Sequence, residues 1–144
     1  MVRPSFTAQP TNVTVSAGAS ASFTVAVAGG GNHSMALSNS GVVTCWGLND
    51  SGQCDTPITL GIATAIAAGN AHSVAVKIDG TVVCWGDNLL GQGSPPAGLS
   101  GVTSVAAGFV HTIALRSDGT IVLQTAQGTL QYVKGQYKRA IAAK

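Results

Sequence analysis

Three histidines are the residues of this chain whose type and spacing could support chemistry. His33, His72 and His111 are separated from one another by 39 positions, and imidazole is both a common metal ligand and an acid–base group near neutral pH. No Asp or Glu recurs beside all three histidines to complete a ligand set. Because buried polar groups are normally satisfied locally, we expect each imidazole to make a buried hydrogen bond that holds its own repeat. We therefore predict no metal and no cofactor.

Carboxylates, the other groups that could perform acid–base catalysis, are few. The chain has no glutamate, and its acidic residues are Asp50, Asp55, Asp79, Asp87 and Asp118. Catalysis needs a nucleophile with an orienting base, or two carboxylates in different environments, and two of these aspartates precede a glycine in a predicted turn. The glycines at 29–31 lack the Lys-Ser/Thr sequel of a phosphate-binding loop. We predict that the chain is not an enzyme.

The cysteines match no metal or disulfide pattern. Cys45, Cys54 and Cys84 are an odd set without the C-x-x-C spacing of zinc and redox sites. We expect reduced, partly buried thiols.

An internal repeat of 39 residues positions all of these side chains. The same offset joins Cys45 to Cys84, Trp46 to Trp85, Gly47 to Gly86, Asn49 to Asn88, Gly52 to Gly91, Gln53 to Gln92, Pro57 to Pro96 and Leu60 to Leu99. A third copy begins near Gly108 and loses the motif at Gln124, where a tryptophan would fall. So many coincidences in one register predict a tandem-repeat fold.

Each repeat is predicted to form short antiparallel strands. In the second copy, residues 72–76 alternate in polarity, Asp79 and Gly80 supply a turn, and residues 81–85, which begin with three β-branched side chains, return as a strand. Further strands are predicted at residues 62–67 and 102–107, each after a proline. A unit of three or four strands cannot bury both faces alone, so neighbouring units must stack on one another.

The second repeat resembles the regulator-of-chromosome-condensation repeat in its short bacterial form. The resemblance rests on the string AAG-x-x-HS-x-A-x-x-x-DG-x-V-x-x-WG-x-N-x-x-GQ at residues 67–92, and it covers about Gly29 to Val122. It implies an all-β fold, a β-propeller that usually has seven blades. Two complete repeats and one truncated repeat are too few for such a ring. We therefore expect a partial propeller, completed or covered by oligomerisation.

The remaining motif residues are interpreted as structural anchors. Trp46 and Trp85 are expected to pack between units rather than to present a ligand-binding face. The residues expected to fix the turn after each of these strands are Asn49, Gln53, Asn88 and Gln92.

The two ends of the chain depart from the repeat, which we assign to residues 22–128. Residues 4–27 resemble the opening strands of a bacterial immunoglobulin-like domain, and we interpret residues 1–21 as a β arm. Alternatively, residues 23–27 form the inner strand of the first unit, because they fall at the repeat position of residues 62–66. Residues 129–144 are predicted to form a last strand and a basic tail, with residues 137–144 able to form a helical turn. Candidate partner contacts are Val13, Val15, Lys134, Lys138 and Arg139.

These features favour a non-catalytic structural or recognition subunit of a homo-oligomeric assembly. The leading hypothesis is a bacteriophage virion component, such as a decoration, tail or fibre protein, whose partners are its own copies and neighbouring assembly proteins. The alternative is a secreted or cell-surface bacterial propeller that binds a protein ligand. The basic tail has few cations and no aromatic stacking platform, so a nucleic-acid partner is disfavoured. We also expect no small-molecule substrate, signal peptide or membrane span.

Overall fold

Short β-strands form the part of the chain that the structure describes. The structure is a computed structural model, and it describes residues 26–133 and 136–138. The strands are β1 (Ala26–Gly29), β2 (His33–Leu37), β3 (Val43–Gly47), β4 (Ala63–Ala68), β5 (His72–Lys77), β6 (Val82–Gly86), β7 (Val102–Ala107), β8 (Thr112–Arg116), β9 (Ile121–Thr125), β10 (Gly128–Val133) and β11 (Gln136–Lys138). Within these residues there is no helix capable of crossing a membrane. The all-β prediction is confirmed.

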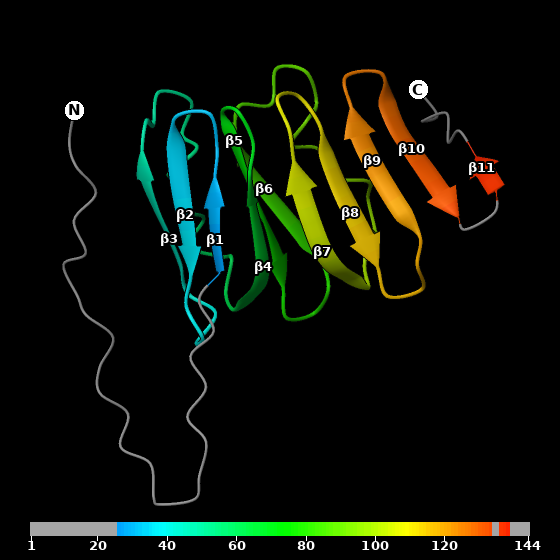
Figure 1. The fold of residues 1–144 in the computed structure, drawn as a ribbon, viewed down its shortest axis with the longest axis horizontal. Coiled ribbons are helices and arrows are strands. Elements are labelled where there is room, and N and C mark those ends of the chain that lie inside the picture. Colours follow the sequence, from blue (N-terminus) through cyan, green and yellow to red (C-terminus); the bar gives the residue numbers. More distant parts are fainter. Residues whose placement is uncertain (1–25, 134–135, 139–144) are drawn as a thin grey trace, which may run out of the picture.

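The strands form three antiparallel sheets that follow one another along the chain (Figure 1). Sheet 1 has the order β1-β2-β3, sheet 2 the order β4-β5-β6, and sheet 3 the order β7-β8-β9-β10-β11. The pairing register repeats with the sequence, because His33 lies opposite Gly47 in sheet 1 and His72 lies opposite Gly86 in sheet 2. One 39-residue repeat therefore corresponds to one sheet.

The hairpin turns follow the chemistry that their sequences predict. The Asp79 carboxylate accepts hydrogen bonds from the Thr81 N–H at 3.0 Å and from the Thr81 hydroxyl at 2.6 Å. Gly80 has a φ of 76°, a region that glycine enters without the steric cost that a side chain brings. In the third repeat, Asp118 accepts a bond from the Thr120 N–H at 2.8 Å. A short acidic side chain and a glycine thus close the turn in both repeats.

Neighbouring sheets pack face to face through two hydrophobic clusters. The buried residues between sheets 1 and 2 are Leu37, Leu60, Ala63 and Ala75. Those between sheets 2 and 3 are Val76, Val102, Ala114 and Val122. The edge strands β1, β4 and β7 lie against one another, as the innermost strands of a propeller do. The same stacking therefore occurs twice, and the structure is a partial propeller.

The third sheet departs from the repeat because β10 and β11 extend it. The strand predicted at residues 129–133 is present as β10. The helical turn predicted from residue 137 was wrong at residues 137 and 138, which lie in β11 and pair with β10. Local sequence pattern did not reveal this pairing, because strand formation depends on the neighbouring strand.

Some predictions fall on residues outside the described ranges. These are the β arm with Val13 and Val15, and the basic residues Lys134 and Arg139. Residues 26 and 27 lie in β1, the inner strand of sheet 1, which agrees with the alternative reading of residues 23–27. The proposed boundaries after residues 21 and 128 stay predictions.

Candidate functional site

A histidine relay joins sheet 1 to sheet 2. His33 Nε2 lies 2.9 Å from the hydroxyl oxygen of Ser73, and the Ser73 hydroxyl donates to the backbone carbonyl of Gln53 at 2.7 Å. All three residues are buried. Since Gln53 belongs to the loop after β3 and Ser73 to β5, the relay ties the start of one hairpin to the end of the preceding one.

The same relay joins sheet 2 to sheet 3. His72 Nε2 lies 3.0 Å from Thr112 Oγ1, and the Thr112 hydroxyl donates to the Gln92 carbonyl at 2.7 Å. Here the Gln92 side chain also donates through Nε2 to Asp87 at 3.0 Å. The repetition of the relay, bond for bond, identifies it as the polar link between consecutive sheets.

The relay holds its histidines neutral. The only proton of the Ser73 hydroxyl goes to Gln53, so its oxygen must accept the His33 Nε2–H, which defines the tautomer. Nδ1 of both His33 and His72 is buried without a hydrogen-bond partner. Protonation of Nδ1 would place a positive charge and an N–H donor without a partner in this buried position. Burial accordingly lowers the pKa of His33 and His72, and the nearby His33 lowers the pKa of His72 further.

Glycine three residues before each relay histidine makes room for the imidazole ring. A Cβ added at Gly30 would lie 2.6 Å from Cε1 of His33, and one added at Gly69 would collide with the His72 ring in the same way. The Gly31 N–H also donates to the Gly69 carbonyl at 3.1 Å, from one sheet to the next. The G-x-x-H string is therefore the local signature of a sheet junction.

The relay hydroxyls of Ser73 and Thr112 were missed by sequence reasoning. The available signal was a hydroxyl residue directly after every repeat histidine, at Ser34, Ser73 and Thr112. His111 also precedes such a residue, yet no bond equivalent to those of His33 and His72 is present for it among residues 26–133 and 136–138. The structure thus brings together two of the three histidines with their neighbours' hydroxyls.

The turn-fixing residues lie in the loops that follow β3 and β6. The Asn49 side-chain oxygen accepts the Cys54 N–H at 2.7 Å, and the Gln53 side-chain oxygen accepts the Ser51 N–H at 2.9 Å. The corresponding bonds of the second loop join Asn88 to Gly93 at 2.8 Å and Gln92 to Leu90 at 3.0 Å. Each glutamine therefore holds its loop through its side chain and the relay through its backbone carbonyl.

The two tryptophans occupy equivalent positions with different surroundings. Trp85 packs against the hydrophobic cluster between sheets 1 and 2, and its indole Nε1 is buried without a hydrogen-bond partner. Trp46 is half-buried in β3, and the described residues contain no sheet before sheet 1 for it to pack against.

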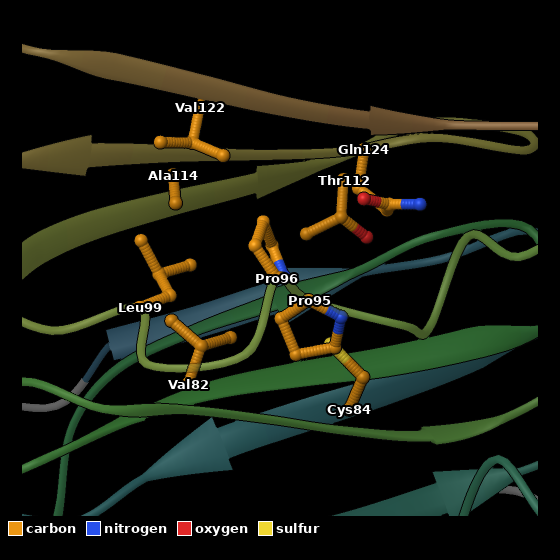
Figure 2. A pocket seen from close by; sticks show the side chains of 9 residues that line it. All are labelled: Val82, Cys84, Pro95, Pro96, Leu99, Thr112, Ala114, Val122 and Gln124. Carbon is orange, nitrogen blue, oxygen red and sulfur yellow. The ribbon is translucent and has the colours of Figure 1, made fainter. Parts of the chain in front are cut away.

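Two of the cavities in the described part of the chain lie beside sheet 3. A cavity of about 10 Å³ lies where Val82 of sheet 2, the Pro95–Pro96 loop and Val122 of sheet 3 meet (Figure 2). This volume suits at most one water molecule. A more open groove of about 420 Å³ runs between that loop and sheet 3, but its one charged residue, Arg116, bonds to the Ser100 carbonyl and pairs with Asp118. Within the described ranges, no three His, Cys, Asp or Glu residues could hold a metal ion.

The repeat units match a known family. Residues 24–53 and 63–92 each match the regulator of chromosome condensation (RCC1) repeat. These two units are RCC1-like repeats. No match was found among the curated protein sequences.

Solved propellers share the arrangement of the RCC1 repeats in this chain. Prp20p from Saccharomyces cerevisiae is 22% identical over 75% of this chain and 32% of its own, with a TM-score of 0.61. The ectodomain of the Physcomitrella patens receptor kinase CR4 is 30% identical over 64% of this chain and 26% of its own, with a TM-score of 0.56. Human WBSCR16 is 19% identical over 71% of this chain and 35% of its own, with a TM-score of 0.58. The chain thus spans about a third or less of each propeller.

Proposed function

We propose that this chain is a non-catalytic, protein-binding subunit of an assembly whose partners are further copies of itself and neighbouring proteins. One repeat position carries the proposal. Leu37 in sheet 1 and Val76 in sheet 2 are 6% and 0% exposed, whereas Leu115 at the same position of sheet 3 is 40% exposed. This apolar position is buried in sheets 1 and 2 but exposed in sheet 3. Such an exposed apolar position favours a protein partner on that face of sheet 3.

The polar groups near the sheet junctions support a role without catalysis. The relay imidazoles of His33 and His72 are buried and engaged by hydroxyls. Burial raises the pKa of the Cys84 thiol to about 12, which leaves almost no reactive thiolate at neutral pH. Asp79 and Asp118 have lowered pKa values because Thr81 and Thr120 donate hydrogen bonds to them. These groups stabilise turns and junctions.

The similar propellers support protein recognition as the general role. The structure of Prp20p was described together with its binding to Gsp1p and histones, and yeast RCC1 (Prp20) was also solved bound to Kap60. This chain covers only about a third of that protein. For this chain we therefore propose protein binding in general, and none of those particular partners. A bacteriophage virion component is the narrower form of the proposal.

Exposed apolar loop residues favour a second candidate, a module that binds a protein ligand through one rim. Leu89 is 92% exposed and Phe109 is 70% exposed. Backbone bonds connect their segments, because Asp87 N–H donates to Ala71 at 2.9 Å and Asn70 N–H donates to the Gly108 carbonyl at 3.2 Å. Such a rim matches the secreted or cell-surface alternative.

The mass of the full chain in solution distinguishes the two candidates. We expect light scattering after size-exclusion chromatography to give a multiple of the 14.3 kDa chain mass. A monomer at every concentration tested would contradict the assembly role and favour the rim-binding module.

A further inference from the structure

The two junctions between sheets show what the bare face of sheet 3 is shaped to receive. We define the exit face of a sheet as the face that packs on the following sheet, and the entry face as the face that packs on the preceding one. Val76 and Val82 belong to the exit face of sheet 2, and Val105, Ala114 and Val122 belong to the entry face of sheet 3. The first junction uses the same repeat positions.

The described residues contain one uncovered face of each kind. On the exit face of sheet 3, Leu115 and Ile121 stand where sheet 2 has Val76 and Val82, and Leu115 is 40% exposed. On the entry face of sheet 1, Val27 and Ala36 stand where sheet 3 has Val105 and Ala114, and Val27 is 76% exposed. The two faces therefore have the side-chain complementarity of an internal junction.

The polar relay is divided between the same two faces. At each internal junction, a histidine of one sheet bonds to the hydroxyl that follows the next histidine. Sheet 3 contributes the histidine, His111, and sheet 1 contributes the hydroxyl, Ser34. In the third repeat β10 takes the place of the glutamine loop, so a ring nitrogen of His111 can accept the Ser34 hydroxyl proton. The strands β10 and β11 extend sheet 3 beyond β9 (Figure 1), and Leu115 on its exit face stays 40% exposed.

We infer that a second copy of this chain docks head to tail, with the entry face of its sheet 1 on the exit face of sheet 3. In this arrangement His111 of one copy accepts a hydrogen bond from the Ser34 hydroxyl of the other, at the position where His72 donates to Thr112 within the chain. The inference rests on the proposed assembly function and adds its contact faces and register. It commits to a second copy because one chain carries both halves of the junction.

The test uses two full-length variants, each blocked on one face. Val27→Asp places a charge on the entry face, and Leu115→Asp places one on the exit face. Ile78→Asp is the matched control, because Ile78 is 69% exposed in a hairpin turn and the other repeats have Asn39 and Ser117 at that position. Circular dichroism and melting temperature establish folding, and Ile121→Lys blocks the exit face if Leu115→Asp does not fold.

Head-to-tail docking gives a distinctive result on mixing. Each blocked variant alone should be monomeric, Ile78→Asp should assemble like the wild type, and an equimolar mixture of the blocked variants should form a one-to-one dimer. The dimer forms because Val27→Asp keeps an intact exit face and Leu115→Asp keeps an intact entry face. If the wild type assembles but the mixture stays monomeric, or if either variant assembles alone, head-to-tail docking is overturned and the assembly function survives. A monomeric wild type overturns both.

The hydrogen bond between His111 and Ser34 can be tested separately in the mixture of the two blocked variants. Ser34→Ala in the Leu115→Asp chain should weaken dimerisation roughly fivefold or more, because it removes a buried hydrogen bond. Ser34→Thr should preserve the affinity, since threonine makes the equivalent bond at Thr112. Equal dissociation constants for the serine and alanine chains, measured by analytical ultracentrifugation, would refute the His111–Ser34 contact.

Discussion

Replacing Ser73 by alanine should destabilise the protein far more than the loss of one hydroxyl on the surface would. Ser73 is fully buried, and its hydroxyl both receives the His33 Nε2–H at 2.9 Å and donates to the Gln53 carbonyl at 2.7 Å. Ser73→Ala leaves the buried His33 Nε2–H without a partner and removes the strong hydrogen bond to the buried Gln53 carbonyl. Each such group costs about 1–3 kcal/mol, and the Gln53 carbonyl keeps only a weak bond from the Cys45 thiol at 3.5 Å.

The expected loss in the free energy of unfolding is therefore about 2–4 kcal/mol, which corresponds to a decrease in melting temperature of roughly 6–15 °C for a chain of this size. Urea unfolding and calorimetry measure the two quantities. Ser73→Thr should stay close to the wild type, because Thr112 performs the same role at the next junction. Ser51→Ala, in an exposed loop position, should also have little effect. A Ser73→Ala protein as stable as Ser51→Ala would refute the relay as a stabilising link.

Three further predictions concern Trp85, the relay histidines and the cysteines of the first repeat. Trp85→Ala should lower the free energy of unfolding by about 3 kcal/mol. Trp85→Phe should lower it much less, because the indole N–H has no hydrogen-bond partner to lose. Equal losses for the two variants in urea unfolding would contradict a packing role for Trp85. Burial lowers the folded-state pKa of His33 and His72, so the unfolded chain binds more protons than the folded chain below about pH 6.5. The free energy of unfolding should therefore be constant above pH ~7 and fall as the pH drops below about 6.5. A urea midpoint that does not change from pH ~7 to ~5 would contradict the lowered histidine pKa values. A Cβ built at Gly93 lies 3.5 Å from Cys84 Cβ, and the equivalent positions in the first repeat are Cys54 and Cys45. This spacing is compatible with a disulfide, so oxidised glutathione should join the two cysteines. Mass spectrometry should detect the loss of two hydrogen atoms in the wild type but not in Cys54→Ser.

The repeat explains why much of the fold could be predicted from the sequence. Asp79 and Gly80 mark a turn by local chemistry, and the alternation of residues 72–76 marks a strand. Because the period is constant at 39 residues, each local assignment was supported by a second copy. The helical turn predicted from residue 137 had no such second copy, and there the strand β11 was missed.

The candidate site was predictable in its histidines and glutamines but not in its connections. His33, His72, Gln53 and Gln92 stood out because the repeat preserves them. The hydroxyl of Ser73 did not stand out, since serine is common in this chain and a bond across 40 positions has no local signature. Repetition marks which residues matter within a unit, but it does not say which unit each side chain reaches.

The sequence by itself determined the period, the strands and the turns, because these depend on side-chain alternation and on residues such as Gly80 that adopt unusual backbone angles. Only the tertiary structure decided that His33 and His72 bond to the following sheet rather than to their own. Only the tertiary structure also distinguished Leu115, which is bare, from Val76, which is covered. The physical reason is that burial and hydrogen bonding between sheets depend on how separate units stack. A sequence pattern that recurs from unit to unit does not predict which units have a neighbour packed on them.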